Sequence, residues 1–526
     1  MAMDSEQQRS AHGPARPSYV FRGHTAQIHS AHITRRNTCL VTGDADGWVV
    51  IWKLETKRPL AVWRAHEGAI LGTAEWGTGK YITHGRDHAL RVWQLDIANT
   101  LHCSTVLPAD GETTDRPKPW LLHSLPVNTL NFCAFSMCYA DLVSKPKCEP
   151  ESISSVLIAV PARDDKKVEV YRFPDEKLAY VVSRVEPKDT GMVMAVKLVY
   201  HQPSRNVVVA VGYEAGMIAV HLLPRVQATE PQATRSPVQL SQIVYLSQPH
   251  TQPILSLDAS PDGTSFFTSS ADAVIATHRI PELPQSLDPG ESQYSEDASP
   301  PETFEEVSAQ LDPASNAPPS DEGRKPTLPS SSNPDLQLSE APTEVEPLTF
   351  SKKPVTPVTS TPTSSLPASK PAGLSSLLSN SAPLPKIKPP PPPIPPITTP
   401  QQAYKVTNTK HAGQQSLCVR SDGRLLVTGG WDSRIRLYSS KTMKEMAVLK
   451  WHKEGVYAVD FGEILSAEDL LSTGNGEPDQ DGDGKQITKR ETGLGKLQRQ
   501  REEQMQMKHW VVAGAKDGKV SLWEVF

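Results

Sequence analysis

The strongest constraint on the fold is a short unit that recurs along the chain: an apolar run, a turn and an alternating strand. Each copy has the pattern of a β-hairpin. An aspartate stands six residues before a tryptophan or tyrosine in four copies, at Asp46/Trp52, Asp87/Trp93, Asp432/Tyr438 and Asp517/Trp523. Because one spacing returns four times, the chain is expected to be built from repeated hairpins.

Each copy also carries a histidine and, in most cases, a threonine. In the compact copies the histidine precedes the aromatic residue by 27 or 28 positions, and the threonine lies four positions before the aspartate. By copy, the residues are His24, Thr42, Asp46 and Trp52; His66, Thr83, Asp87 and Trp93; His411, Thr428, Asp432 and Tyr438; and His452, Asp517 and Trp523. A further copy has His250, Thr268 and Asp272, with His278 in the tryptophan position.

The period of the repeat indicates a β-propeller. Trp52 and Trp93 are 41 residues apart, and a period of about 40–45 residues with Gly-His near the front and Trp near the back marks propeller blades. Five blades are expected before residue 281, a sixth from His411 and a seventh from His452. The sequence therefore predicts an all-β, seven-bladed WD-repeat β-propeller.

Two of the seven blades are expected to be degenerate. One spans 126–171, with residues 127–135 as its first strand. The next spans 191–223, with Glu214 in the aspartate position and Val220 in the tryptophan position. Since both lack the polar residues of the repeat, their stability should come mainly from apolar burial.

In the other blades the repeated polar residues could satisfy one another's hydrogen bonds. An isolated buried polar group costs roughly 1–3 kcal/mol, so a histidine, hydroxyl, carboxylate and indole N–H buried together should form a relay. We label the strands of a blade a to d from the centre outward. A histidine–aspartate bond would then place the d–a loops and the b–c turns at one face of the ring.

The last copy of the repeat predicts how the ring closes. Elsewhere a fourth strand follows the aromatic residue, but only three residues follow Trp523. The segment Ser18–Arg22 matches the fourth-strand pattern and precedes His24 without a blade of its own. We therefore expect residues 18–22 to form the outer strand of blade seven, whose edge would otherwise be open to unwanted pairing.

A long stretch expected between blades five and six has the composition of a disordered segment. Of the 48 prolines, 28 lie between residues 281 and 400, a stretch with no tryptophan. It cannot bury enough apolar surface to offset an ordering entropy of roughly 1–2 kcal/mol per residue. We expect disorder over 281–404 and 1–17, which leaves propeller portions at 18–280 and 405–526.

A second insertion, at about 463–508, interrupts blade seven. It contains an acidic loop and a polar helix candidate at 494–509. A charged surface excursion is favoured here over a partner-binding helix.

Charge and motifs argue against an enzyme, a nucleic-acid-binding protein and a membrane protein. The net charge of −5 combines an acidic and a basic part of the insertion with a nearly neutral remainder, which lacks the field that non-specific nucleic-acid binding needs. No apolar run approaches the ~20 residues of a membrane span. The cluster His24, His29 and His32 has no ligand partner at metal-binding spacing. We expect no catalytic residues, metal or cofactor.

The b–c turns supply candidate partner-binding residues. The residue before each repeat aspartate would lie on the shared face, and these residues are Ala45, Arg86, Trp431 and Lys516. Arginine and tryptophan are common interface anchors, so Arg86, Trp431 and Lys516 form a candidate partner-binding ring. Trp431 could instead pack on the neighbouring blade, and both interpretations stay open.

Several stretches resemble the ASTRA-associated protein 1 family of WD-repeat proteins. They are YVFRGHTAQIHSA (19–31), LVTGDADGWVVIWKL (40–54), HEGAILG (66–72), THGRDHALRVWQLD (83–96) and VVAGAKDGKVSLWEVF (511–526). The resemblance implies a nuclear, non-enzymatic scaffold subunit of the ASTRA complex. It implies roles in chromatin regulation and in assembly of phosphatidylinositol-3-kinase-like kinases. The implied partners are a Tra-type pseudokinase, RuvB-like ATPases and Tel- and Tti-type factors.

Two other classes stay open at this point. One is a G-protein-β-like signalling propeller or another WD-repeat adaptor. A G-protein-β-like propeller normally has an N-terminal coiled-coil helix, but residues 1–17 lack the heptad repeat of such a helix. An enzyme on a propeller is the other, and it would need a convergent acid–base or metal cluster at the central channel.

Overall fold

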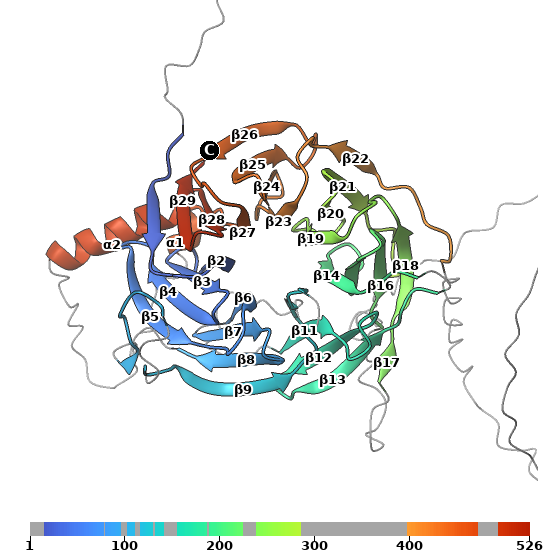
Figure 1. The fold of residues 1–526 in the computed structure, drawn as a ribbon, viewed down its shortest axis with the longest axis horizontal. Coiled ribbons are helices and arrows are strands. Elements are labelled where there is room, and N and C mark those ends of the chain that lie inside the picture. The colour runs from blue at the N-terminus through green and yellow to red at the C-terminus, as the bar shows by residue number, and fades with distance from the viewer. Residues whose placement is uncertain are drawn as a thin grey trace, which may run out of the picture. The chain divides into compact units, whose positions relative to one another are not determined.

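A computed structural model describes residues 15–77, 79–95, 102–110, 116–129, 132–140, 155–186, 189–224, 238–285, 397–471 and 493–525. The chain divides into one unit of residues 1–292 and 393–526 and another of 293–392, which lies outside the described residues. In the first unit, the described strands form seven small sheets arranged around a central channel (Figure 1). The predicted seven-bladed propeller is confirmed.

Blades one, two and seven contain the clearest copies of the repeat. Blade one has β2 (Ile28–Thr34), β3 (Cys39–Asp44), β4 (Trp48–Lys53) and β5 (Arg58–Arg64). Blade two has β6 (Ile70–Trp76), β7 (Lys80–Gly85), β8 (Ala89–Gln94) and β9 (Trp120–Pro126). Blade seven has β27 (Val456–Phe461), β28 (Trp510–Ala515), β29 (Lys519–Glu524) and β1 (Tyr19–Arg22).

The remaining blades complete the ring. Blade three has β10 (Ser136–Tyr139), β11 (Val156–Pro161), β12 (Val168–Phe173), β13 (Lys177–Val182) and β17 (Gln239–Leu240). Blade four has β14 (Val193–His201), β15 (Asn206–Tyr213), β16 (Ile218–Leu222) and β18 (Gln242–Ser247). Blade five has β19 (Ile254–Ala259), β20 (Ser265–Ser270), β21 (Val274–Arg279) and β22 (Lys405–Asn408). Blade six has β23 (Gln414–Val419), β24 (Leu425–Gly430), β25 (Arg434–Ser439) and β26 (Glu445–Lys450).

The ring closes as the sequence predicts. The N-terminal strand β1 pairs antiparallel with β29, with Tyr19 opposite Leu522 and Arg22 opposite Lys519. Phe21 is 1% exposed, and its ring centroid lies 5.1 Å from that of Trp52. The N-terminal strand is thus both the edge of blade seven and part of the apolar layer shared with blade one.

Apolar side chains between neighbouring blades form the core. Strand b is fully buried in several blades, which fits its continuous apolar run. In blades three and four, one cluster contains Leu157, Val170, Val196 and Val211. Burial therefore takes the place of the polar relay in the two degenerate blades.

The first strand of blade three differs from the prediction. Strand a is Ser136–Tyr139, whereas the described part of 127–135 has no strand. The prediction was wrong because residues 127–129 form part of the d–a loop: the Val127 N–H donates to the His88 carbonyl, and the Asn128 and Thr129 side chains donate to the carbonyls of Ala162 and Arg86. The second and third strands of this blade are β11 and β12.

The long insertion lies within blade five, before its fourth strand, and not after it as expected. Strand β22 pairs with β21, from Val274 opposite Asn408 to Thr277 opposite Lys405. The insertion therefore separates the third and fourth strands of blade five, rather than blades five and six. Its ends are ordered beyond the expected boundaries, since Leu283 is buried and the Gln401 N–H donates to the Leu246 carbonyl. Most of 281–404 lies outside the described residues, as does 1–14.

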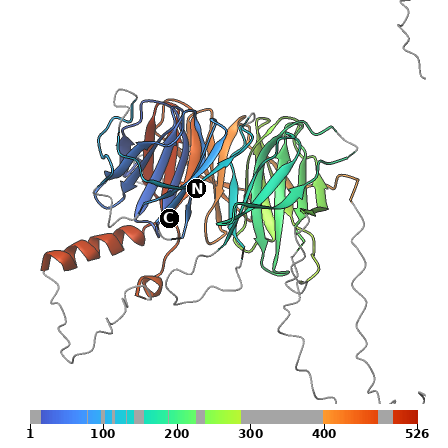
Figure 2. The same ribbon diagram turned by 90° about the horizontal axis from the view of Figure 1, so that it is seen from below.

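In its described residues, 463–471 and 493–508, the second insertion contains two helices, α1 (Ala467–Leu471) and α2 (Gly493–Gln506). The predicted polar helix is present, and its C-terminal end rests on blades one and seven (Figure 2). The Trp510 indole N–H donates to the Met505 carbonyl at 2.7 Å, and the Asn37 amide donates to the Gln506 carbonyl at 2.7 Å. Neither helix, nor any other in the described ranges, is long and apolar enough to span a bilayer.

Candidate protein-interaction face

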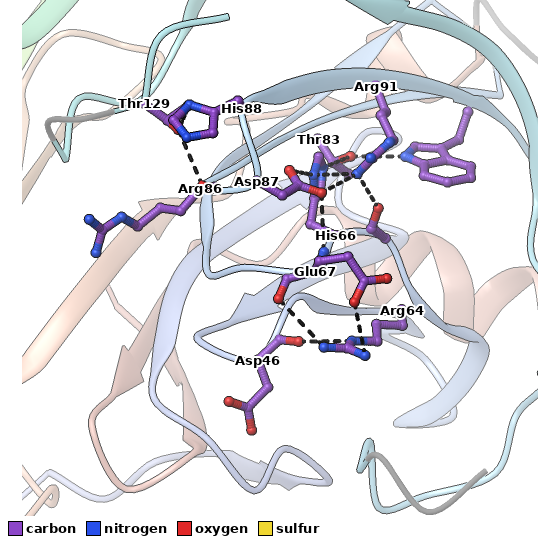
Figure 3. A network of polar contacts seen from close by, with 12 residues as sticks. Asp46, Arg64, His66, Glu67, Thr83, Arg86, Asp87, His88, Arg91 and Thr129 are labelled. Carbon is purple, nitrogen blue, oxygen red and sulfur yellow. Dashed lines mark hydrogen bonds and ion pairs between the residues drawn. The ribbon is translucent and has the colours of Figure 1, made fainter. Parts of the chain in front are cut away.

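In blade two the four repeat residues are joined in one relay (Figure 3). The His66 Nδ1 lies 2.7 Å from Asp87 Oδ1, and its Nε2 lies 2.7 Å from the Thr83 hydroxyl. The Trp93 indole N–H donates to the same hydroxyl at 2.9 Å. His66 thus connects the d–a loop to strand b and to the b–c turn.

The electrostatics of this relay favour a neutral histidine beside a charged carboxylate. Burial lowers the pKa of His66, and the bond to Asp87 opposes this only in part. Burial would raise the pKa of Asp87, but hydrogen bonds from His66 and Arg91 hold that pKa well below its usual range. A neutral ring can donate from Nδ1 to the carboxylate and accept from the Thr83 hydroxyl at Nε2.

In blade one the carboxylate of the relay comes from Asp44, not from Asp46 as predicted. His24 Nδ1 lies 2.7 Å from Asp44 Oδ2, and Nε2 lies 2.8 Å from the Thr42 hydroxyl, which also accepts the Trp52 indole N–H at 2.9 Å. Asp44 ends strand b and is fully buried, whereas Asp46 is exposed in the turn.

The difference between blades one and two has a steric cause. Gly85 in blade two takes the position of Asp44, and a Cβ there would lie 2.3 Å from the His66 ring. Blade two must therefore supply its carboxylate from two residues later. The spacing between aspartate and tryptophan does not reveal which of the two positions supplies the carboxylate.

Blade five has a related relay without tryptophan. His250 Nε2 lies 3.0 Å from the Thr268 hydroxyl, and its Nδ1 lies 3.2 Å from Asp272. His278 Nε2 lies 3.1 Å from the same hydroxyl. The histidine in the tryptophan position thus takes the place of the indole N–H.

Blade six assembles its polar residues differently. Gln414 takes the central position, since the Thr428 hydroxyl donates to its amide oxygen at 2.7 Å. The predicted histidine, His411, is partly exposed and lies 3.8 Å from Asp432, which pairs with Arg436 at 2.5 Å. Tyr438 is buried.

Blade seven draws its relay hydroxyl from strand c. His452 Nε2 lies 2.7 Å from the Ser521 hydroxyl, to which the Trp523 indole N–H donates at 2.8 Å. Asp517 lies 4.0 Å from His452 Nδ1, and burial lowers the pKa of His452 to about 4. Sequence reasoning missed Ser521; the signal is Ala513, which has no hydroxyl at the usual strand-b position.

The b–c turns and the d–a loops lie on one face, which we call the b–c face. The residue before each repeat aspartate donates its main-chain N–H into the d–a loop of its own blade. These bonds are Ala45 to Gln27 O at 2.9 Å, Arg86 to Ala69 O at 2.9 Å, Trp431 to Gly413 O at 3.0 Å and Lys516 to Gly455 O at 2.9 Å. These hydrogen bonds therefore fix the main-chain position from which each side chain projects.

The b–c turns of blades one, four and seven also pack on the following blade. Glycines Gly47, Gly216 and Gly518 have φ of 84°, 76° and 72°. A Cβ at these positions would lie 2.0, 2.3 and 2.6 Å from the carbonyl oxygens of the next relay histidines, His66, His250 and His24. Only glycine fits so close to a carbonyl, so the b–c face is a tightly connected surface.

The three candidate partner-binding residues lie on blades six, seven and two. With Ala45 on blade one, they cover four consecutive blades of the ring. Arg86 points away from the relay (Figure 3), and its guanidinium lies 4.5 Å from the centroid of the exposed Phe132 ring. Within the described part of the chain, neither Arg86 nor Lys516 has an ion pair.

The Trp431 side chain packs on its own blade and is still exposed. It packs on its own d–a loop, where a Cβ on Gly413 would lie 2.1 Å from the indole. Its indole N–H donates to Gln415 at 2.8 Å. The side chain nevertheless remains 47% exposed, so packing positions it without covering it.

The first strands of all seven blades surround a channel cavity of 730 Å³. Charged side chains line it in pairs that also join neighbouring blades. His32 Nδ1 lies 2.7 Å from Asp460, and Lys197 lies 2.6 Å from Asp258. Burial lowers the pKa of His32, but Asp460 outweighs this and raises it. Both carboxylates accept a main-chain N–H from the next blade, so the pairs tie the ring together.

The early histidine cluster is divided among three environments. His24 belongs to the relay, His29 stacks 6.3 Å from Tyr457 and His32 faces Asp460. Across the ranges that the structure describes, no group of three histidine, cysteine or acidic side chains is arranged to hold a metal ion.

Comparison with known proteins gives relatives of similar length. The family described as ASTRA-associated protein 1 has a sequence model that matches residues 17–523. ASTRA-associated protein 1 of Pyricularia oryzae is 38% identical over 521 residues, 98% of this chain and 98% of the relative. That of Aspergillus niger is 36% identical, also over 98% of both chains. That of Schizosaccharomyces pombe is 24% identical over 85% of this chain and 93% of the relative.

Proposed function

We propose that this chain, which belongs to the ASTRA-associated protein 1 family, is a non-enzymatic interaction subunit of the ASTRA complex that binds partners through its b–c face. The observation that carries the proposal is the match to relatives of that name over 98% of both chains. The b–c face adds a physical basis, because it presents Arg86, Trp431 and Lys516 from a main chain held by hydrogen bonds.

The finer parts of the proposal rest on family resemblance. The proposed partners are a Tra-type pseudokinase, RuvB-like ATPases and Tel- and Tti-type factors. The proposed roles are assembly of phosphatidylinositol-3-kinase-like kinases and chromatin regulation, in the nucleus. A rigid ring with no expected catalytic residue suits such a role, since a scaffold needs stable surfaces.

The face can be tested with a triple variant, Arg86→Ala, Trp431→Ala and Lys516→Ala, in the full-length tagged chain. We expect the purified variant to lose at least one large partner, because truncating interface anchors typically costs 2 kcal/mol or more, roughly 30-fold in affinity. Quantitative mass spectrometry of the co-purified chains gives the readout.

A matched control changes three exposed residues near the starts of outer strands, Arg58→Ala, Lys177→Ala and Met446→Ala, which lie at the end of the strands away from the b–c face. Full recovery of every partner by the b–c variant, with an unchanged melting curve, would refute the role of this face. Recovery of G-protein-γ-like chains in place of a kinase-like chain and RuvB-like ATPases would refute the family role.

A further inference from the structure

The outer strands of several blades share a bulge at one position. One residue of strand d has no partner on strand c because the register shifts there; these residues are Leu60, Leu122, Ala179, Val244 and Met446. Two positions later, strand d turns its main-chain groups outward, away from strand c. This position is the natural place for a further strand to pair.

In three blades the outward groups at this position are already paired with an extended segment of the chain. The Val62 N–H donates to Ser104 O at 2.7 Å in blade one. The Val181 carbonyl accepts from Ser241 at 3.4 Å in blade three, beside the short parallel strand β17. The Leu246 carbonyl accepts from Gln401 at 2.6 Å in blade four.

These covering segments follow one topological rule. Each belongs to the connection between strands c and d of the next blade. The connection from β8 to β9 covers blade one, that from β16 to β18 covers blade three, and that from β21 to β22 covers blade four. A long c–d connection therefore returns along the rim and covers the blade before it.

Blade two is left open by this rule. Its cover would have to come from the connection between β12 and β13, which has only residues 174–176. That connection supplies a side chain, since Glu176 lies 2.7 Å from His123 Nδ1. In the part of the chain that the structure describes, no main-chain group pairs with the outward side of Ser124.

Ser124 is the counterpart of Val62. It lies opposite Arg91 as Val62 lies opposite Val50, and it follows the bulged Leu122 by two positions. The edge is held in place from behind, because His123 packs against Phe173 with centroids 5.5 Å apart. The outer edge of β9 is thus ordered before any partner arrives.

The side chains of β9 also set it apart from the other open edges. Trp120, Leu121 and Leu122 are 77%, 43% and 38% exposed, and the strand contains no Asp, Glu, Lys or Arg. The other open edges carry permanent charges, Arg22 on β1, Lys405 on β22, and Glu445 and Lys450 on β26. Charges of this kind normally protect an edge from pairing.

We propose that the outer edge of β9 (Figure 1) is a strand-addition site for an extended, apolar segment of a partner protein. Main-chain hydrogen bonds would supply affinity, and the exposed Trp120 and Leu122 would select apolar side chains. The site lies on the outer rim and does not depend on the b–c face.

A partner segment fits this edge better than the two other possible occupants. The connection that would cover it from within the chain is too short, as described above. A second copy paired through β9 would bury one seven-residue edge, far below the roughly 1,200–2,000 Å² of a stable specific interface. A segment of a subunit that is held by further contacts does not need that area.

The test removes one outward N–H while keeping the fold. Ser124→Pro deletes the main-chain donor at an edge position, where proline is tolerated. Ser124→Ala keeps the donor, and Val448→Pro makes the same change at the equivalent position of the charged strand β26. Leu122→Lys is a second variant that adds a charge without altering the main chain.

Full-length tagged variants are purified with their complex, and each co-purified chain is quantified by mass spectrometry. We expect Ser124→Pro and Leu122→Lys to lower one partner by at least about tenfold, with Ser124→Ala and Val448→Pro unchanged. A photo-crosslinker at position 122 should then react with an apolar segment of that partner.

Unchanged recovery by both variants would overturn the proposal. So would crosslinks from position 122 that reach only residues of this chain or a second copy of it. The triple variant of the b–c face is purified in parallel. If that variant loses a partner but Ser124→Pro and Leu122→Lys do not, the proposed function stands and the β9 site is refuted.

Discussion

Replacement of Phe21 by alanine tests ring closure most directly. The side chain is 1% exposed and packs in a cluster with Trp52, Val520 and Leu522. Phe→Ala changes in cores typically cost 3–5 kcal/mol, and we expect a loss of that size in the free energy of unfolding. The assay is urea denaturation of the full-length protein followed by tryptophan fluorescence.

Tyr19 provides a matched control, because it lies two residues away on the same strand and is 39% exposed. Tyr19→Ala should cost no more than about 1 kcal/mol. Deleting residues 1–23 should have a larger effect than Phe21→Ala and should speed hydrogen exchange of the β29 amides, which lose their partner strand. Equal losses for Phe21→Ala and Tyr19→Ala, or unchanged β29 exchange after the deletion, would refute closure by β1.

Three further predictions concern buried polar groups. Asp44→Asn should cost about 1.5–3 kcal/mol, because a charged acceptor is lost, whereas Asp46→Asn should change stability by less than about 0.5 kcal/mol; equal effects in urea denaturation would contradict the relay assignment. Ser521→Ala should cost about 1–3 kcal/mol by leaving an indole N–H without an acceptor, and an unchanged urea midpoint would argue against this. His84 is buried and has no hydrogen-bond partner among the residues that the structure describes, and burial lowers its pKa to about 3 from 6.5. The unfolded chain therefore binds the proton more readily, and stability falls as pH drops from about 6.5 toward 3. Relative to its own value at pH 7.5, His84→Leu should retain about 2 kcal/mol more stability than the unchanged protein at pH 5, measured by urea denaturation at both pH values; parallel pH profiles would exclude this role.

The ring and its closure could be predicted because they depend on periodic features. A strand is recognised from the alternation of apolar and polar residues, and a blade from the repeat period. Both signals come from many residues together. The match of Ser18–Arg22 to a fourth strand is of this kind, and it is confirmed by the pairing of β1 with β29.

The errors concern groups whose roles depend on a few atoms in three dimensions. Asp46 has the repeat spacing to Trp52, yet Asp44 is the carboxylate that bonds His24. Blade two uses the later aspartate because a side chain at Gly85 would collide with His66. Ser521 is invisible to a pattern that places every hydroxyl on strand b.

The boundaries of the insertion could not be predicted for a related reason. A low apolar content argues against a core, but main-chain pairing at a rim needs no apolar side chains. Gln401 is held by one hydrogen bond to Leu246 and β22 by the ladder to β21. Neither contact leaves a hydrophobic signature in the sequence.

The position of β1 in the ring has a consequence for synthesis on the ribosome. Roughly 500 residues separate β1 from β29, so at about 5–20 residues per second the first strand is made some 25–100 s before its partner. During that interval blade seven cannot form, and an interrupted translation product that stops before Lys519 can never close. Ring closure therefore requires translation of the chain through β29.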